Sequence, residues 1–220
     1  MLDRLAVRAL IREVSVPLFP QPSHPPEWQP PHSPGITPGF PGWLEERLFD
    51  QRIVMLRGQL NAETASGIVA ALLTLDSAGP EAIHLHVSSS GGDLSAALSV
   101  VDVLDALAAP VHALVTAEAG GAALAVIAAA DQRAAYRHAR FKLSEPRTAG
   151  VTGTADEVAA AAGQHLRELE EVVIRLAELT GKPRSRIEDD LSGGRSLSAA
   201  EAVDYGLIDE VVTPKKNGPR

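Results

Sequence analysis

The 220-residue sequence contains no cysteine, and aromatic residues make up only 4% of it. Without cysteine the chain can form no disulfide, carry no thiolate nucleophile and bind no zinc through sulfur. Because aromatic rings are scarce, the packing of a core depends on alanine and the aliphatic side chains. Apolar residues still account for 45% of the chain, and its length fits one domain with a sizeable core.

Several other features are missing from the chain. No charge-free apolar stretch reaches the length of about 20 residues that a membrane-spanning helix needs. The first residues, Met1-Leu2-Asp3-Arg4, do not have the basic start of a secretory signal. The net charge is −8, and no dense basic cluster is present to bind phosphates. We therefore expect a cytoplasmic protein with neither a nucleic acid nor a membrane as its partner.

Proline is concentrated near the N-terminus, where residues 17–42 contain ten of the prolines. Proline at this density removes backbone donors and favours extended, unpaired chain. Apolar spacing in residues 1–15 suggests one short amphipathic helix before it. We expect a flexible proline-rich arm over residues 1–42, a folded domain over 43–213 and a disordered tail over 214–220.

Strand and helix patterns alternate through the folded domain. The sequence predicts strands at residues 53–58, 83–87 and 111–116, with helices at 62–75, 93–108 and 122–130 and a glycine turn at 88–92. Two capping boxes, Thr154 with Glu157 and Ser198 with Glu201, start later helices. The first of these runs to Thr180 and is closed by Gly181. Alternation of this kind predicts a layered α/β fold with right-handed crossovers.

The segment from Ala119 to Ala122 is built like a nucleophile elbow, in which a strand turns sharply into a helix. It contains Gly120 and Gly121 but no nucleophilic side chain. Backbone N–H groups at such a turn can hold a developing oxyanion. Glycine pairs before helices also occur as plain tight turns, so this pattern alone assigns no activity.

Two longer segments are more specific, His86-Val87-Ser88-Ser89-Ser90-Gly91-Gly92 and Ser198-Ala199-Ala200-Glu201-Ala202-Val203-Asp204-Tyr205-Gly206-Leu207-Ile208-Asp209-Glu210. Together with residues 48–58, 113–131 and 140–146, they resemble the Clp protease proteolytic-subunit (ClpP) family over about residues 45–213. The resemblance implies an α/β, ClpP/crotonase-like layered fold of repeated β-β-α units with a long protruding helix. It also implies a serine peptidase without a cofactor, stacked in heptameric rings and fed by an ATP-driven AAA+ unfoldase.

The family's catalytic residues are incomplete here. The resemblance places the nucleophilic serine at Gly120, the general-base histidine at Ser144 and the triad acid at Asp190, with backbone oxyanion donors at Gly92 and Gly121. Between Ser99 and Ser144 there is no serine or cysteine, and His138 is too far from the base position for a shifted alignment to restore the triad. Loss of nucleophile or base abolishes most triad catalysis. We therefore expect an inactive structural or regulatory subunit that joins its own copies or paralogous subunits.

Two other activities fit parts of the pattern. A crotonase-like enzyme would use the same two backbone donors on an acyl-thioester, with Glu118 or Glu145 as acid or base. These carboxylates could instead be solvated or pair with Arg140 or Arg147. The second alternative is a serine peptidase with a non-standard site.

His84 and His86 share one face of a predicted strand, at a spacing that can ligate a metal. The sequence places no third ligand beside them, so we expect no metal site. Asp93 is interpreted as a helix N-cap.

The predicted helix at residues 154–180 carries one apolar stripe, and two interpretations of this stripe are open. It packs on the domain's own core, or it forms an interface between rings, as the resemblance implies. The stripe consists of Val158, Ala162, Leu166, Leu169, Val172, Val173 and Leu176.

Overall fold

The computed structural model describes residues 41–147, 150 and 152–213. The helix expected at residues 1–15, the proline-rich arm as far as residue 40 and the tail at 214–220 lie outside the described residues. The described part opens with a helix that the sequence analysis did not predict, α2 (Gly42–Asp50), with Pro41 as its N-cap.

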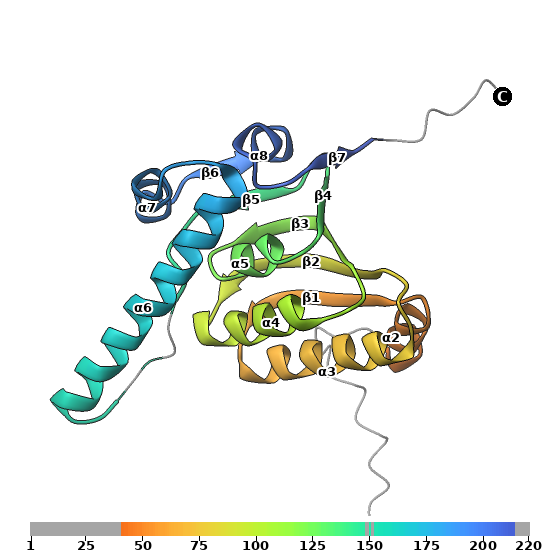
Figure 1. Cartoon of the computed structure of the whole chain (residues 1–220), viewed down its shortest axis with the longest axis horizontal. Helices are drawn as coiled ribbons and strands as arrows, with labels where there is room; N and C mark the ends of the chain where they lie inside the picture. The colour runs from red at the N-terminus through yellow and green to blue at the C-terminus, as the bar shows by residue number, and fades with distance from the viewer. Residues whose placement is uncertain (1–40, 148–149, 151, 214–220) are drawn as a thin grey trace, which may run out of the picture. The chain divides into compact units, whose positions relative to one another are not determined.

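A mostly parallel sheet forms the centre of the described part (Figure 1). Its strands run in the order β1-β2-β3-β4-β7, while β5 pairs with the end of β3 and, antiparallel, with β6. The strands are β1 (Ile53–Leu60), β2 (Ile83–Gly92), β3 (Val111–Gly120), β4 (Gln132–Tyr136), β5 (Arg140–Lys142), β6 (Ser196–Ser198) and β7 (Glu210–Val212). The predicted α/β class is therefore confirmed.

Helices connect these strands. They are α3 (Ala62–Ala78), α4 (Leu94–Ala106), α5 (Ala123–Ala128), α6 (Ala155–Thr180), α7 (Arg184–Ser192) and α8 (Ala199–Tyr205). Figure 1 shows α3, α4 and α5 together on one side of β1, β2 and β3. No helix in the described ranges is long and apolar enough to cross a membrane.

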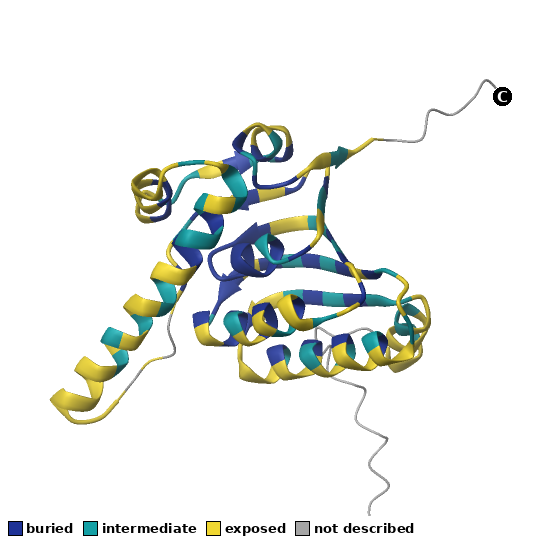
Figure 2. Ribbon diagram, viewed as in Figure 1, coloured by how far each residue is buried: buried dark blue, intermediate teal, exposed yellow. Residues whose placement is uncertain are grey.

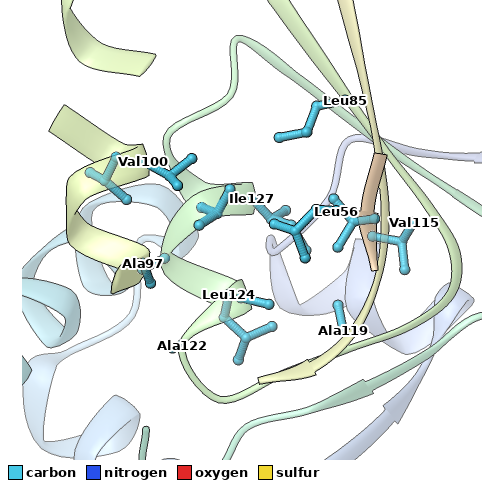
Figure 3. Close-up of a cluster of buried hydrophobic side chains, with 14 of the residues drawn as sticks. Leu56, Leu85, Ala97, Val100, Val115, Ala119, Ala122, Leu124 and Ile127 are labelled. Carbon is cyan, nitrogen blue, oxygen red and sulfur yellow. The ribbon is translucent and has the colours of Figure 1, made fainter. Parts of the chain in front are cut away.

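The core lies between the sheet and these helices. Alternate residues of neighbouring strands, such as Leu56, Leu85 and Val115, are buried and face α4 and α5 (Figures 2 and 3). Small side chains such as Ala97 let α4 approach closely, which fits the scarcity of aromatic residues. Packing of this kind contributes about 25 cal/mol per Å² of apolar surface removed from water, and it fixes the strand ends that form the site.

The strands run further than the sequence predicted. Residues 88–92, expected as a turn, continue β2 to Gly92, because they pair with the end of β1 after a register shift. Gly92 has a φ of 145°, and a Cβ there would lie 2.2 Å from the carbonyl oxygen of Leu60. A side chain would push these strands apart, so glycine here permits a strand rather than a turn. β3 likewise extends beyond Thr116 to Gly120.

The predicted helix starts are confirmed. Asp93, Thr154 and Ser198 each accept a hydrogen bond from a backbone N–H in the first turn of α4, α6 and α8, and the two capping boxes are complete. Gly181 follows α6 in the left-handed conformation, with a φ of 66°, as expected for a helix-ending glycine.

The long helix α6 is buried only near its C-terminal end. Val172, Val173 and Leu176 pack into the core, whereas Leu166 is 65% exposed and Val158 43% exposed. In Figure 1 the N-terminal half projects away from the sheet, and Figure 2 colours it mostly as exposed. The core interpretation of the apolar stripe therefore holds for the last turns of α6 but not for the first.

Candidate functional site

A cleft of about 160 Å³ opens where β1 and β2 end and the chain leaves β5. It collects three of the five site residues that the resemblance implied, Gly92, Gly121 and Ser144. The complete lining is Gln59, Ser90, Gly91, Gly92, Gly121, Lys142, Ser144, Glu145, Pro146 and Arg147. The parallel sheet produces this meeting, because the carboxyl ends of β1, β2 and β3 lie at the same edge.

Gly120, where the resemblance places the nucleophile, is the last residue of β3 and is buried. Ser90 of β2 and Lys142 of β5 lie on either side of it. A Cβ on Gly120 would lie 3.0 Å from the Ser90 carbonyl oxygen and 3.3 Å from the Lys142 carbonyl oxygen. Both neighbours are backbone atoms, so the position is tight for any side chain.

Ser144, where the resemblance places the general base, is half-buried in the cleft. Its Oγ atom lies 3.8 Å from where a Cβ on Gly121 would stand. The side chain at this position therefore faces the elbow. No histidine lines the cleft among the residues that the structure describes.

The backbone of the elbow is partly engaged in strand contacts. Gly121 adopts a φ of 48°, and its N–H donates to the Lys142 carbonyl oxygen over a long distance of 3.3 Å. On the other side of the cleft, the Gly92 carbonyl accepts from the Arg147 N–H, also at 3.3 Å. The Gly121 N–H must leave Lys142 before it can donate to a bound ligand.

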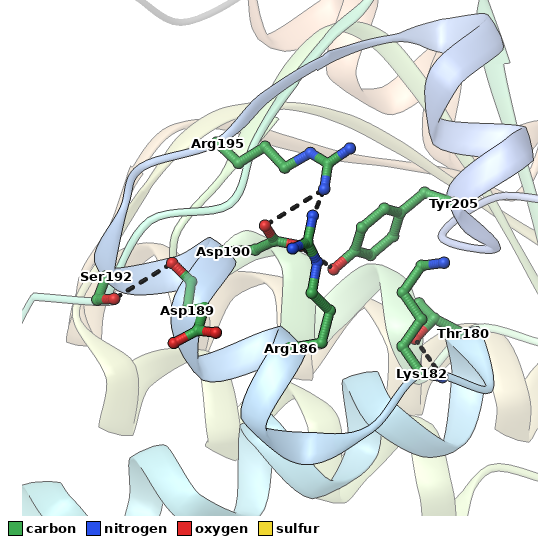
Figure 4. Close-up of polar contacts among 8 residues, drawn as sticks. All are labelled: Thr180, Lys182, Arg186, Asp189, Asp190, Ser192, Arg195 and Tyr205. Carbon is green, nitrogen blue, oxygen red and sulfur yellow. Dashed lines mark hydrogen bonds and ion pairs between the residues drawn. The ribbon is translucent and has the colours of Figure 1, made fainter.

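Asp190 lies in a separate polar cluster on α7 and does not line the cleft (Figure 4). Its carboxylate accepts a hydrogen bond from the Tyr205 hydroxyl at 2.8 Å and pairs with Arg195 at 3.2 Å and Arg186 at 3.1 Å. The two regions are nevertheless linked through the backbone. The Leu143 N–H donates to the Arg195 carbonyl, and the Arg195 N–H donates to the Asp190 carbonyl.

The cluster stabilises the charged form of Asp190. Burial by itself would raise the pKa of this carboxyl, but the Tyr205 hydrogen bond and the positive charges of Arg195 and Arg186 together lower it. Burial and the hydrogen bond to Asp190 raise the pKa of the Tyr205 phenol. The described partners of this carboxylate are a phenol and two guanidinium groups, so in this structure it orients no catalytic base.

Charged residues that the sequence analysis did not assign to the site also line the cleft. Lys142 and Arg147 bring positive charge, and Gln59 brings an amide. The spacing of Lys142 and Ser144 along an extended segment was an available signal, because residues two apart share a face. Chemically, the cleft offers a ligand polar groups, the two cations and the Glu145 carboxylate.

The two carboxylates considered for an acyl-thioester reaction are separated by the fold. Glu145 lines the cleft, whereas Glu118 is on β3 opposite Arg140 and outside the cleft lining. Among the described residues, neither carboxylate forms an ion pair with Arg140 or Arg147. Glu145 is therefore the one of the two that could reach a ligand in the cleft.

His84 and His86 are far from the cleft along β2, on the sheet face opposite the helices. Burial, followed by the neighbouring His84, lowers the pKa of His86. Within residues 41–147, 150 and 152–213, no group of three or more His, Cys, Asp or Glu side chains is arranged to hold a metal ion.

A comparison with protein families agrees with the α/β fold. The family model described as Clp protease matches residues 43–215, which is most of the chain and includes the cleft and the Asp190 cluster. This match extends across every helix and strand from β1 to β7. The chain therefore belongs to the Clp protease family.

Proposed function

We propose that this protein is a catalytically inactive subunit of a Clp peptidase complex, with a structural or regulatory role. The observation that carries the proposal is Gly120. At the nucleophile position it has no group that can be acylated, and the Ser90 and Lys142 carbonyls crowd the place where a side chain would begin. Between Ser99 and Ser144 the sequence contains no other serine and no cysteine that could serve as the nucleophile.

The other triad positions support the same proposal. Ser144 replaces the base, and a hydroxyl cannot take a proton from a nucleophile near neutral pH as imidazole does. Asp190 is retained, but it is engaged by Tyr205, Arg195 and Arg186. We assign it to holding α7, the loop before β6 and α8 together. Gly92 and Gly121 remain the backbone groups that would face a bound peptide carbonyl.

We further propose that the protein assembles in heptameric rings with its own copies or with paralogous subunits, and that an AAA+ unfoldase is a partner of the complex. The exposed stripe on α6, including Val158 and Leu166, supports an interface between rings, since it continues a buried stripe on the same helix face. An inactive subunit can shape the chamber or the docking of the unfoldase without cutting substrate.

A fluorophosphonate probe tests the proposed inactivity directly, because it reacts covalently with activated serine nucleophiles. We expect no labelling of the full chain under conditions in which an active serine peptidase is labelled completely. The matched variant Ser144→Ala should be indistinguishable from the wild-type chain. Peptide mapping of any labelled material identifies the residue that reacted.

Covalent labelling of Ser144 that disappears in the Ser144→Ala variant would overturn the proposal. It would instead support a serine peptidase with a non-standard site, using Ser144 within reach of the same cleft. Cleavage of peptide substrates by the wild-type chain, absent in that variant, would lead to the same conclusion.

The acyl-thioester alternative is supported by one observation, the presence of Glu145 in the cleft with the two glycine backbones. Calorimetric titration with acetyl-CoA tests it. Saturable heat that Glu145→Gln weakens would favour this activity, whereas no heat would leave the inactive-subunit proposal in place.

A further inference from the structure

Within the described part of the chain, α3, α4 and α5 cover one face of the sheet, and two histidines from adjacent strands meet on the other face (Figure 1). The register of β2 and β3 places His84 directly beside His112, and their ring centroids are 5.6 Å apart with the planes at 75°. The neighbours of these residues on each strand, Leu85 and Ala113, face the opposite, helix-covered side and are buried. His112 is the partner that the sequence could not place beside His84.

The separation of the two rings suits a shared metal ion. Zinc binds imidazole nitrogen at about 2.0–2.1 Å in tetrahedral geometry, which holds the centroids of two ligand rings about 5 Å apart. The observed distance between the two ring centroids is 5.6 Å, so a small side-chain rotation is enough to bring the rings to the metal-binding distance. Parallel pairing sets this distance, since the backbones of adjacent strands lie about 4.8 Å apart.

The surroundings leave both rings available. His84 is exposed and His112 half-buried, and no hydrogen bond or ion pair engages an imidazole nitrogen of either residue within the described ranges. Both line a hollow of about 490 Å³ that His86 also lines. Arg133 is in the same hollow, but its charge is balanced by Asp209 at 2.9 Å, so it opposes a bound cation only weakly.

We propose that His84 and His112 form a surface site for a divalent transition-metal ion such as Zn²⁺. The chain supplies two ligands and no third among the described residues, where no group of three or more His, Cys, Asp or Glu side chains is arranged to hold a metal ion. Water completes the coordination shell, and the ligand class follows from imidazole, which suits zinc, copper and nickel. The metal site is on the sheet face opposite the helices, whereas the cleft is at the carboxyl ends of the strands. The metal site is therefore independent of the proposed inactivity.

Isothermal titration of the full chain with ZnCl₂ tests the site. We expect one saturable event, with His84→Ala and His112→Ala each weakening zinc affinity at least tenfold. His138→Ala is the matched control because this histidine is also exposed, and it should change the affinity less than twofold. The double variant His24→Ala/His32→Ala should behave like the His138 control. Circular dichroism melts establish that each variant is folded.

The absence of zinc binding by the wild-type chain would overturn the proposal. So would loss of binding in His86→Ala or His24→Ala/His32→Ala while His112→Ala binds normally, because the ligands would then be others. A measurement on the wild-type chain avoids any folding defect. Zinc should protect His84 and His112, but not His138, from modification by diethyl pyrocarbonate, and equal modification with and without zinc would contradict the site.

Discussion

Gly120 illustrates how neighbouring strands restrict the side chain that one residue can carry. The carbonyls of Ser90 and Lys142 approach the Cα atom of Gly120 so closely that a Cβ would touch both. The adjacent strands β2 and β5 are each paired with β3 at this point, so neither can move without disturbing the sheet. A side chain at residue 120 would therefore require a shift of these backbones.

Gly120→Ala should lower the free energy of unfolding by about 1–3 kcal/mol, the usual cost of overpacking a tight buried position. Gly120→Ser should be destabilised similarly and should show no peptidase activity, even when combined with Ser144→His. Urea unfolding followed by circular dichroism measures the first effect, and hydrolysis of fluorogenic peptides the second.

Gly163→Ala is the matched control. Gly163 is in α6, and a Cβ there would meet only the tip of the Arg167 side chain at 3.6 Å. This variant should be stabilised by about 0.5–1 kcal/mol, because alanine is the better helix former. A Gly120→Ala variant as stable as the wild type would show that the strands yield more easily than we infer.

Asp190→Asn should be less stable than the wild type by about 2–3 kcal/mol at pH 7, since it weakens hydrogen bonds to a charged acceptor. The pKa of Asp190 is lower in the folded chain than the usual value of about 3.9. Its stabilising contribution is therefore complete above that usual value and is lost as the pH falls through the folded-state pKa. Thermal melts between pH 7 and pH 3 should show the two proteins converging at the acidic end.

Asp189→Asn provides the comparison, because this neighbouring carboxylate is exposed and forms no ion pair among the described residues. It should melt within a degree or two of the wild type at every pH. A constant difference between wild type and Asp190→Asn across the range would mean that the charge of Asp190 is not what stabilises the cluster.

At the scale of elements, α6 combines two environments in one helix. Its capping box and apolar stripe are continuous, but only the C-terminal turns reach the core, at Val172, Val173 and Leu176. A 26-residue helix is longer than this domain can cover. The first half therefore presents apolar side chains to whatever lies beside it.

Leu166→Glu should disrupt pairing between rings without unfolding the subunit, because Leu166 is 65% exposed. Sedimentation velocity should show loss of the largest species. The free energy of unfolding should stay within about 0.5 kcal/mol of the wild-type value. Ala160→Glu, on the opposite face of α6, should leave assembly unchanged. Equal assembly of the two variants would remove α6 from the proposed interface.

At the scale of the whole molecule, the predicted assembly can be weighed directly. Mass photometry at micromolar concentration should reveal particles of seven copies, or twice seven, of the 23.1 kDa chain. If paralogous subunits are required, these particles should form only after mixing with an active Clp peptidase subunit. Monomers under both conditions would exclude the ring.

Local patterns in the sequence were sufficient for much of the fold. The helices that begin at Ala62, Leu94, Ala155 and Ala199 follow from caps and apolar spacing, because these signals act over a few residues. The helix α2, which begins at Gly42 and buries no side chain, carried no such apolar signal. The strand over residues 88–92 was missed because its stability depends on pairing with β1 rather than on its own glycine-rich sequence.

By itself, the sequence determined that residue 120 is a glycine and residue 144 a serine, since residue identity needs no structure, and the roles of these two positions stay predictions from the family resemblance. Only the tertiary structure decided how the neighbouring groups are used. Strand pairing closes the space at Gly120 and engages the Gly121 N–H, the ion cluster engages Asp190, and parallel register brings His112 beside His84. These contacts join residues that are distant along the chain. The distances between such residues are set by the packing of the core and the pairing of the strands, which local sequence patterns do not contain.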